Sequence, residues 1–280
     1  QRGGFLATVE CVEVWCPMSR EFYNRYLDPG MTASKKKLLY VMNPNKVRAC
    51  EFLIRYHEKR GDKIIVFSDN VFALRYYAEA LRMPFIFGDT SQQERLYILE
   101  QFRQGTTFNT VFISKIGDTA IDIPEATVII QISSHFGSRR QEAQRLGRIL
   151  RPKGLGSRNQ QAFFYSLVSQ DTSEMFYSTK RQKFLVDQGY SYRVLNNVHD
   201  VIASDDGGQE MKLMKSKQEE LKLLEQIMAA DDKSGETEQI EGLNKKTRKN
   251  ASAKDKSGGK GAMYTEVKKT SHPLFRRRNK

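Results

Sequence analysis

The sequence predicts an α/β fold in which a doubly wound, mostly parallel sheet carries helices on both faces. Across residues 38–170, short apolar runs alternate with amphipathic stretches of about 11–15 residues, the pattern of consecutive βαβ units. The run Ile64–Phe67 contains no polar residue, which is typical of a parallel strand buried on both faces. At 280 residues, the chain is long enough to enclose the core of one large domain or two small ones.

The first helix and strand of this region have clear end signals. Asn43 is a favourable N-cap residue, and Pro44 suits the first helical position, where an N–H would have no partner. Gly61 ends this helix, and the buried strand Ile64–Phe67 follows. A second helix is predicted over residues 70–82.

The same alternation continues to residue 190. Ser91 and Glu94 have the spacing of a capping box, which predicts a helix that begins there and ends at Gly105. The other predicted elements are strands at 85–87, 110–114 and 127–132, a helix over roughly 138–150, a strand at 162–168 and a helix over 171–190. In such a sheet, ligands bind beyond the carboxyl ends of the strands.

The two ends of the chain differ from this region. Residues 1–37 are interpreted as a linking segment, and residues 38–204 as one domain with its C-terminal extension. Residues 205–230 are predicted to form a marginal helix, because their Leu, Met and Ile residues recur with a helical period. Residues 231–280 have few apolar side chains, which predicts a disordered basic tail.

Charge, apolar runs, cysteine spacing and the first residue limit the kinds of protein to which this chain can belong. The chain carries a formal charge of +13, and residues 243–280 alone carry +11, so the rest is almost neutral. No run of roughly 18 apolar residues occurs, which excludes a transmembrane helix. The three cysteines lack the spacing of zinc ligands. The chain opens with Gln1 and not with Met, which suggests a piece of a longer protein.

The predicted helix near 138–150 carries the strongest chemical signal. Gln144, Arg148 and Arg151 fall on one helical face, and neither of the two arginines has an acidic residue three or four positions before it. Guanidinium groups without such partners suit bidentate binding of phosphate. On spacing alone, solvated cations that gain from the helix dipole are an equally good interpretation.

The loop from Ser114 to Pro124 shifts this balance toward phosphate. It leaves a strand and contains Gly117, where backbone N–H groups can approach a phosphate closely. Asp122 can accept a hydrogen bond from a ribose hydroxyl. The loop is a weak signal by itself, and a stronger one beside the arginine helix.

Several motifs in this order resemble superfamily 2 helicases. Residues 144–151 resemble motif VI, residues 114–124 motif V and residues 64–68 motif IV, and Gly88 with Arg95 is similar to the segment after motif IV. Motif V departs from the family pattern at Ala120, where glycine is usual. The resemblance covers about residues 38–170 and implies a RecA-like second motor domain.

The resemblance also implies roles for individual residues. Arg148 and Arg151 would be arginine fingers that meet the γ-phosphate of ATP. Contacts on the nucleotide side would come from Gln144, Asp122 and Gly117. The DNA backbone would be held by Ser68, Gly88, Ser114 and Arg95. The chain contains no phosphate-binding loop and no acidic Mg²⁺-binding box, so ATP and Mg²⁺ would be held mainly by the other motor domain. This chain alone is therefore expected to be inactive.

The run from Ile116 to Lys153 closely resembles the helicase family of the general transcription factor TFIIH. That resemblance implies an ATP-driven double-stranded-DNA translocase with 3′-to-5′ helicase polarity, acting in promoter opening and nucleotide excision repair. It also implies a nuclear location, and as partners DNA, the protein's own N-terminal motor domain and other TFIIH subunits, with no membrane.

Other interpretations of the sequence stay open. The arginine helix and the basic tail could belong to a nucleic-acid-binding module without a motor, whose affinity would fall steeply with salt and ignore ATP. A small-molecule α/β enzyme would need a dinucleotide loop or a nucleophile–base pair, and neither is found. A protein-interaction scaffold is favoured only by the 209–229 helix. Lys35–Lys37 could touch DNA, but a solvated turn before a strand is the favoured interpretation.

Overall fold

A computed structural model describes residues 9–105, 107–115, 126–133, 161–196 and 211–231, together with the backbone of 256–257 and 264–265. The chain divides into two compact units, Gln1–Glu238 and Gln239–Lys280. In the second unit, β8 (Lys256–Ser257) pairs antiparallel with β9 (Tyr264–Thr265). The rest of the predicted disordered tail lies outside the described residues, as does the predicted arginine helix.

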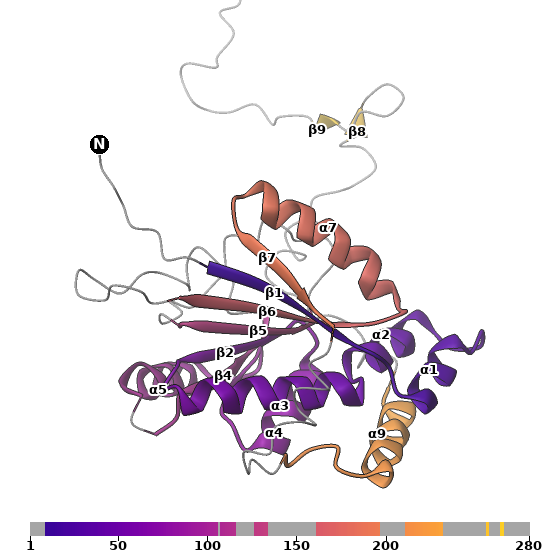
Figure 1. Ribbon diagram of the computed structural model, residues 1–280, viewed down its shortest axis with the longest axis horizontal. Coiled ribbons are helices and arrows are strands. Elements are labelled where there is room, and N and C mark those ends of the chain that lie inside the picture. Colours follow the sequence, from indigo (N-terminus) through magenta and orange to yellow (C-terminus); the bar gives the residue numbers. More distant parts are fainter. Residues whose placement is uncertain are drawn as a thin grey trace, which may run out of the picture. The chain divides into compact units, whose positions relative to one another are not determined.

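The first unit contains a seven-stranded sheet in the order β3-β4-β2-β5-β6-β1-β7. Every neighbouring pair in it is parallel, which confirms the predicted fold class (Figure 1). The carboxyl ends of its strands therefore lie along one edge. The strands are β1 (Val9–Cys16), β2 (Ile64–Ser68), β3 (Phe85–Ile86), β4 (Thr110–Ile113), β5 (Val128–Ser133), β6 (Ala162–Ser169) and β7 (Ser191–Leu195).

Helices pack on both faces of this sheet. Because successive strand residues point to opposite faces, Ile64 and Val66 join one apolar cluster and Ile65 joins the other. The first cluster includes α3 (Pro44–Lys59) and α4 (Val71–Leu81), and the second includes α5 (Gln92–Gln104) and α7 (Ser173–Asp187). Strand β2 is accordingly buried at all five positions, as the uninterrupted apolar run predicts.

The predicted helix starts are confirmed at the level of individual hydrogen bonds. The side chain of Asn43 accepts from the N–H of Asn45, and that of Asn70 accepts from Ala73. The Ser91 hydroxyl accepts from the N–H of Glu94, as in a capping box. Gly105 follows α5 with φ of 65°, a left-handed conformation that glycine adopts without steric cost.

The interpretation of residues 1–37 as a linking segment is corrected by the structure. Val9–Cys16 forms β1, an interior strand that pairs with β6 on one side and β7 on the other. Two helices follow, α1 (Arg20–Leu27) and α2 (Ala33–Val41). Lys35–Lys37 therefore lie within a helix and not in a turn before a strand.

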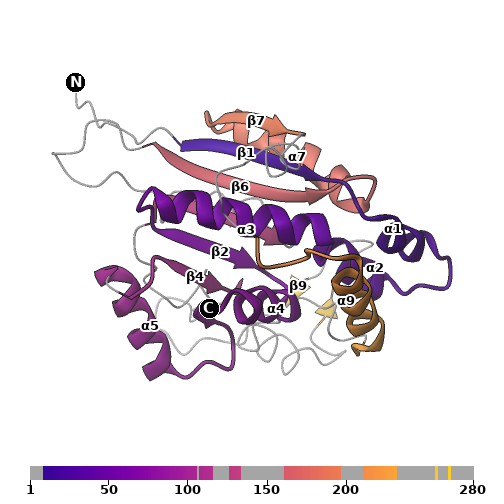
Figure 2. The same cartoon turned by 60° about the horizontal axis from the view of Figure 1, so that its bottom comes forward.

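The predicted helix near the end of the first unit is α9 (Lys217–Ala229). It begins later than the expected start, because the Ser216 hydroxyl caps it by accepting from the N–H of Glu219. Helices α1, α2 and α9 gather where the strands end (Figures 1 and 2). Among the described helices, none has the length and apolar character that a membrane crossing requires.

Candidate nucleic-acid interface

Four of the nine predicted site residues fall in the described part of the chain, and all four lie at or just after the carboxyl ends of neighbouring strands. Ser68 ends β2, Ser114 follows β4, and Gly88 and Arg95 belong to the loop and helix after β3. The other five lie outside the described residues, so their expected roles remain predictions: Gly117, Asp122, Gln144, Arg148 and Arg151.

Three serines stand side by side at the ends of β4, β2 and β5. Phe67 pairs with Ile113, so the next residues, Ser68 and Ser114, continue on adjacent strands. On the other side the register slips by one residue after Phe67, which sets Ser68 opposite Ser133. An irregularity of this kind re-aims side chains at the end of a strand. The Ser68 and Ser133 Oγ atoms are 2.8 Å apart as a result.

The Asp69 carboxylate organises this edge. The Ser133 hydroxyl donates to Asp69 Oδ1 at 2.5 Å, and Lys37 Nζ lies 3.4 Å from Asp69 Oδ2. Because Ser133 gives its one proton to Asp69, Ser68 has to donate to Ser133 or to the Asn70 carbonyl, 2.9 Å away. We call Lys37, Ser68, Asp69 and Ser133 the strand-end cluster.

Exposure differs sharply within this region. The Asp69 side chain is 1% exposed and that of Lys37 17%, so solvent reaches this ion pair from the side of the lysine. Ser68 and Ser114 are fully buried, and among the described residues the Ser114 hydroxyl has no hydrogen-bond partner. Sequence reasoning favoured a solvated turn for Lys37 and did not predict its ion pair with Asp69, although Thr32 gave a signal for the helix by capping α2 through the N–H of Lys35.

Arg95 shapes the loop after β3. Its guanidinium donates to the carbonyls of Phe87, Gly88 and Thr90 at 3.2, 2.6 and 2.8 Å. The Thr90 hydroxyl accepts from the N–H of Phe87, which tightens the turn further. Arg95 therefore fixes the backbone around Gly88, and the predicted contact of either residue with DNA remains a prediction.

A buried ion pair ties the next two strand ends together. Lys46 Nζ lies 2.6 Å from Glu174 Oε2 and donates to the Ile132 carbonyl at 3.2 Å. The N–H of Ser169 donates to the same carboxylate oxygen at 2.8 Å. Burial raises the pKa of Glu174, and Lys46 and this N–H act in the opposite direction. The pair joins α3, β5, β6 and α7 at one point.

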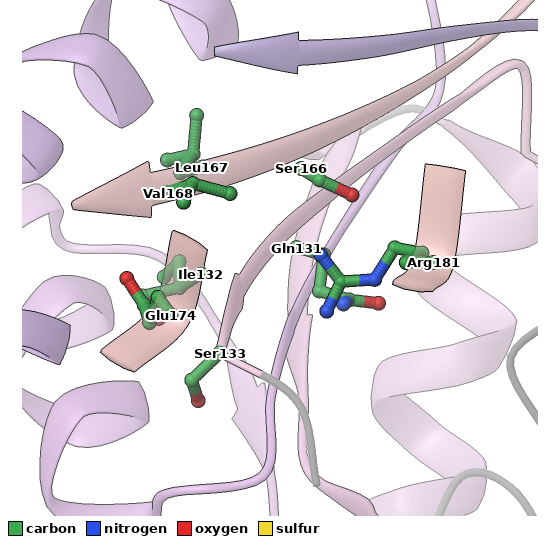
Figure 3. Close-up of a pocket in the computed structure, with 8 residues that line it drawn as sticks. All are labelled: Gln131, Ile132, Ser133, Ser166, Leu167, Val168, Glu174 and Arg181. Atoms are coloured by element: carbon green, nitrogen blue, oxygen red, sulfur yellow. The ribbon is translucent and has the colours of Figure 1, made fainter. Parts of the chain in front are cut away.

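A small pocket lies beside this ion pair, between β5, β6 and α7 (Figure 3). Ser133 lines it, so the pocket adjoins the strand-end cluster. Arg181 is 8% exposed and brings a cation from α7 to its wall. The remaining lining residues are Gln131, Ile132, Ser166, Leu167, Val168 and Glu174. Within the described ranges, no three His, Cys, Asp or Glu side chains gather as a metal site would need.

Comparison with known proteins identifies the family. The family model described as "ERCC3/RAD25/XPB C-terminal helicase" matches residues 1–255. A Dictyostelium discoideum relative, "General transcription and DNA repair factor IIH helicase/translocase subunit XPB", is 60% identical over 86% of this chain and 29% of its own length. The subunit of the same name from Danio rerio is 52% identical over 99% of this chain and 36% of its own.

A yeast relative, "helicase/translocase subunit XPB/SSL2" of Saccharomyces cerevisiae, is 63% identical over 70% of this chain and 23% of its own length. The chain thus spans about a third or less of these relatives. Solved structures give weaker matches. The C-terminal domain of the Sulfolobus solfataricus SWI2/SNF2 ATPase is 17% identical over 62% of this chain and 85% of its own, with a TM-score of 0.42. Yeast Dbp5 bound to RNA and ADP BeF3 is 15% identical over 69% of this chain and 43% of its own, with a TM-score of 0.49.

The assignment rests on the sequence matches, which cover most of the chain at more than half identity. They agree with the parallel α/β sheet and with the motifs at its strand ends. The chain belongs to the family of ERCC3/RAD25/XPB C-terminal helicase domains.

Proposed function

We propose that this chain is the second motor domain of an ATP-dependent DNA helicase and double-stranded-DNA translocase. Its membership of the XPB C-terminal helicase family carries this proposal. Three relatives that span two to four times its length bear the name helicase/translocase subunit, which supports a role in a larger enzyme.

The proposal divides the ATP site between two domains. Arg148 and Arg151 would stabilise the charge that develops on the γ-phosphate, while Gln144, Asp122 and Gly117 would contact the nucleotide. The phosphate-binding lysine and the Mg²⁺-binding acids would come from the first motor domain, because this sequence contains neither motif. ATP bound there would supply the β–γ phosphoanhydride bond, whose hydrolysis to ADP and phosphate drives movement.

The DNA backbone would pass along the carboxyl-end edge of the sheet. Ser68, Ser114, Gly88 and Arg95 are the proposed contacts from sequence. Because the two serine hydroxyls are buried, contact with phosphate would use their backbone or follow a local rearrangement. Lys37 is the additional residue that we propose here, since its side chain is partly exposed beside the buried Asp69 carboxylate. An ammonium has three N–H donors, so Lys37 can donate a hydrogen bond to a phosphate oxygen while it keeps its contact with Asp69.

The cellular role follows from the names of the relatives. They are subunits of general transcription and DNA repair factor IIH. We propose that the protein acts in the nucleus with other subunits of that factor, opens promoters, serves nucleotide excision repair and moves with 3′-to-5′ helicase polarity.

The test is DNA-stimulated ATPase activity of the full-length protein. Arg148→Ala should lower turnover by about 10³-fold or more, as for the loss of an arginine finger, and Arg151→Ala should be comparably severe. Arg139→Ala makes the same charge change outside the motif and should leave turnover within about twofold. The 280-residue chain by itself should hydrolyse no ATP.

Two results would overturn this proposal. Normal DNA-stimulated turnover in the Arg148→Ala enzyme would refute the proposed role of Arg148 as an arginine finger. DNA binding that is strong in the full-length protein, while ATP is neither bound nor hydrolysed, would favour a module that grips phosphate without a motor.

A further inference from the structure

The segment of residues 211–231, which we call the strap, is docked on the helices before β2. Its helix α9 contributes Leu223, Leu224 and Ile227 to the main apolar cluster, and Met214 is buried ahead of the helix. The strap is therefore part of the packed domain although it comes late in the sequence. In both views α9 lies against α2, at the end of the sheet where the strands finish (Figures 1 and 2).

Charged side chains of α3 hold the backbone at the start of the strap. The Glu51 carboxylate is buried and accepts from the N–H groups of Lys212 and Leu213 at 2.6 and 2.9 Å. The Arg48 guanidinium donates twice to the Met214 carbonyl, at 2.6 and 2.9 Å. Hydrogen bonds to charged groups are stronger than neutral ones, so these contacts fix where the strap begins.

Lys35 of α2 holds the other end of the strap. Its ammonium donates to the carbonyl oxygens of Ile227 at 2.9 Å and Met228 at 3.1 Å, and also to that of Ala230. The last carbonyls of a helix have no partner within it and carry partial negative charge. A cation at this position therefore completes the helix end and attaches α2 to α9.

Lys37 lies two residues further along α2 and points to a different face, because a helix turns by about 100° per residue. It binds Asp69 in the strand-end cluster, whereas Lys35 binds the strap. The neighbouring Lys36 takes a third direction, over the Tyr26 ring at 5.8 Å. Helix α2 is thus held between the strap and the ends of the strands.

We propose that Lys35 is a positioning residue for DNA binding: by holding α2 on the strap, it keeps Lys37 seated on Asp69 at the carboxyl-end edge of the sheet. The inference rests on the proposed function, in which this edge faces the DNA backbone. The strap is far in sequence from the residues of that edge. By this proposal it affects DNA affinity although it does not itself contact DNA.

The experiment is a double-mutant cycle in the full-length protein, read out as the DNA concentration that half-saturates ATPase activity. Lys37→Met should raise this concentration about fivefold and reduce the salt slope of DNA binding by about 1, the loss of one phosphate contact. Lys35→Met should raise it by a similar factor, with basal and maximal turnover unchanged. The double variant should have the same half-saturating DNA concentration as Lys37→Met alone, because both substitutions act through one contact with DNA.

Two further variants separate positioning from simple charge loss. Lys59→Met removes a lysine at the exposed last residue of α3 and should leave the half-saturating concentration unchanged. Lys35→Arg retains a donor cation and should restore most of the affinity. Hydrogen exchange provides a readout independent of activity: the amides of the last turn of α9, such as the Ala230 N–H that donates to the Gln226 carbonyl, should lose protection in Lys35→Met and keep it in Lys59→Met.

The outcomes distinguish this inference from the proposed function. If Lys37→Met leaves DNA activation unchanged, the assignment of the DNA edge fails. If Lys37→Met weakens DNA activation but Lys35→Met does not, the edge stands and the positioning role of Lys35 is refuted. Additive effects of the two changes, or strap amides that stay protected in Lys35→Met, would refute it equally.

Discussion

Replacing Lys46 by Met would test how the buried ion pair supports the strand ends. The Lys46 ammonium is fully buried, and its loss would leave the Glu174 carboxylate with the Ser169 N–H but without its bonded cation; the charge of Arg181 acts on it only without a bond to it. Met has a similar length and no charge, so packing changes little. Removing one partner of a buried pair costs about 3–5 kcal/mol in the free energy of unfolding. We expect a loss of that size at neutral pH.

The loss should depend on pH in a definite direction. Burial raises the native-state pKa of Glu174 above its ordinary value of 4.5. Between the unfolded-state and native-state pKa values, the native chain holds a proton that the unfolded chain has released, so stability falls as pH rises. Without Lys46 the native pKa rises further, and each added unit is worth about 1.4 kcal/mol. The variant should therefore be least impaired at acidic pH, where Glu174 is protonated in both states, and most impaired once the pH exceeds its native-state pKa.

Urea unfolding of this chain at several pH values would measure both effects. Lys59→Met is the matched control, and its free energy of unfolding should stay within about 0.5 kcal/mol of the parent. Adding Glu174→Gln to Lys46→Met should restore a large part of the loss at neutral pH, because the buried carboxylate that lost its bonded cation is then removed as well. A loss under 1 kcal/mol, or one that is the same at every pH, would refute this account of the pair.

Three further predictions use the same kinds of measurement. Burial lowers the pKa of His57 below about 6.5, so stability should fall as pH drops through the interval between the unfolded and native pKa values, and His57→Gln should flatten that slope in urea unfolding. Burial raises the pKa of Cys16 to about 12, so the native chain should resist a thiol reagent at pH 8 until denaturant is added; rapid labelling would contradict its burial. Deleting residues 243–280 removes a net charge of +11, and should leave the melting temperature unchanged while weakening non-specific DNA binding and its salt dependence; a large drop in melting temperature would show that this tail supports the fold.

Local signals in the sequence predicted the α/β alternation well, because each depends on a few adjacent residues. Asn43, Asn70 and Ser91 cap their helices in the structure as their side-chain chemistry suggests. The strand β1 was the main error. Its place between β6 and β7 depends on pairing with strands about 150 and 180 residues later, which periodicity does not encode.

Helix α2 shows a second limit of pattern reasoning. Leu38–Val41 are four consecutive buried residues, which resembles a strand covered on both faces. They form a helical stretch that is buried nearly all round, because both α1 and α9 pack on α2. Only the tertiary structure shows that a segment near residue 220 covers a helix near residue 38.

The candidate DNA edge depends on that same long-range packing. Ser68 and Ser114 could be chosen from the sequence because each follows a strand, but Ser133 joins them only through the slip in register after Phe67. Lys37 joins them because α2 is a helix that packs against both α1 and the strap. A phosphate-binding edge assembled in this way is sensitive to residues that never touch DNA. Some substitutions in the strap should therefore weaken DNA binding while they leave the melting temperature unchanged. DNA titrations and melting curves on the same set of proteins would reveal such variants.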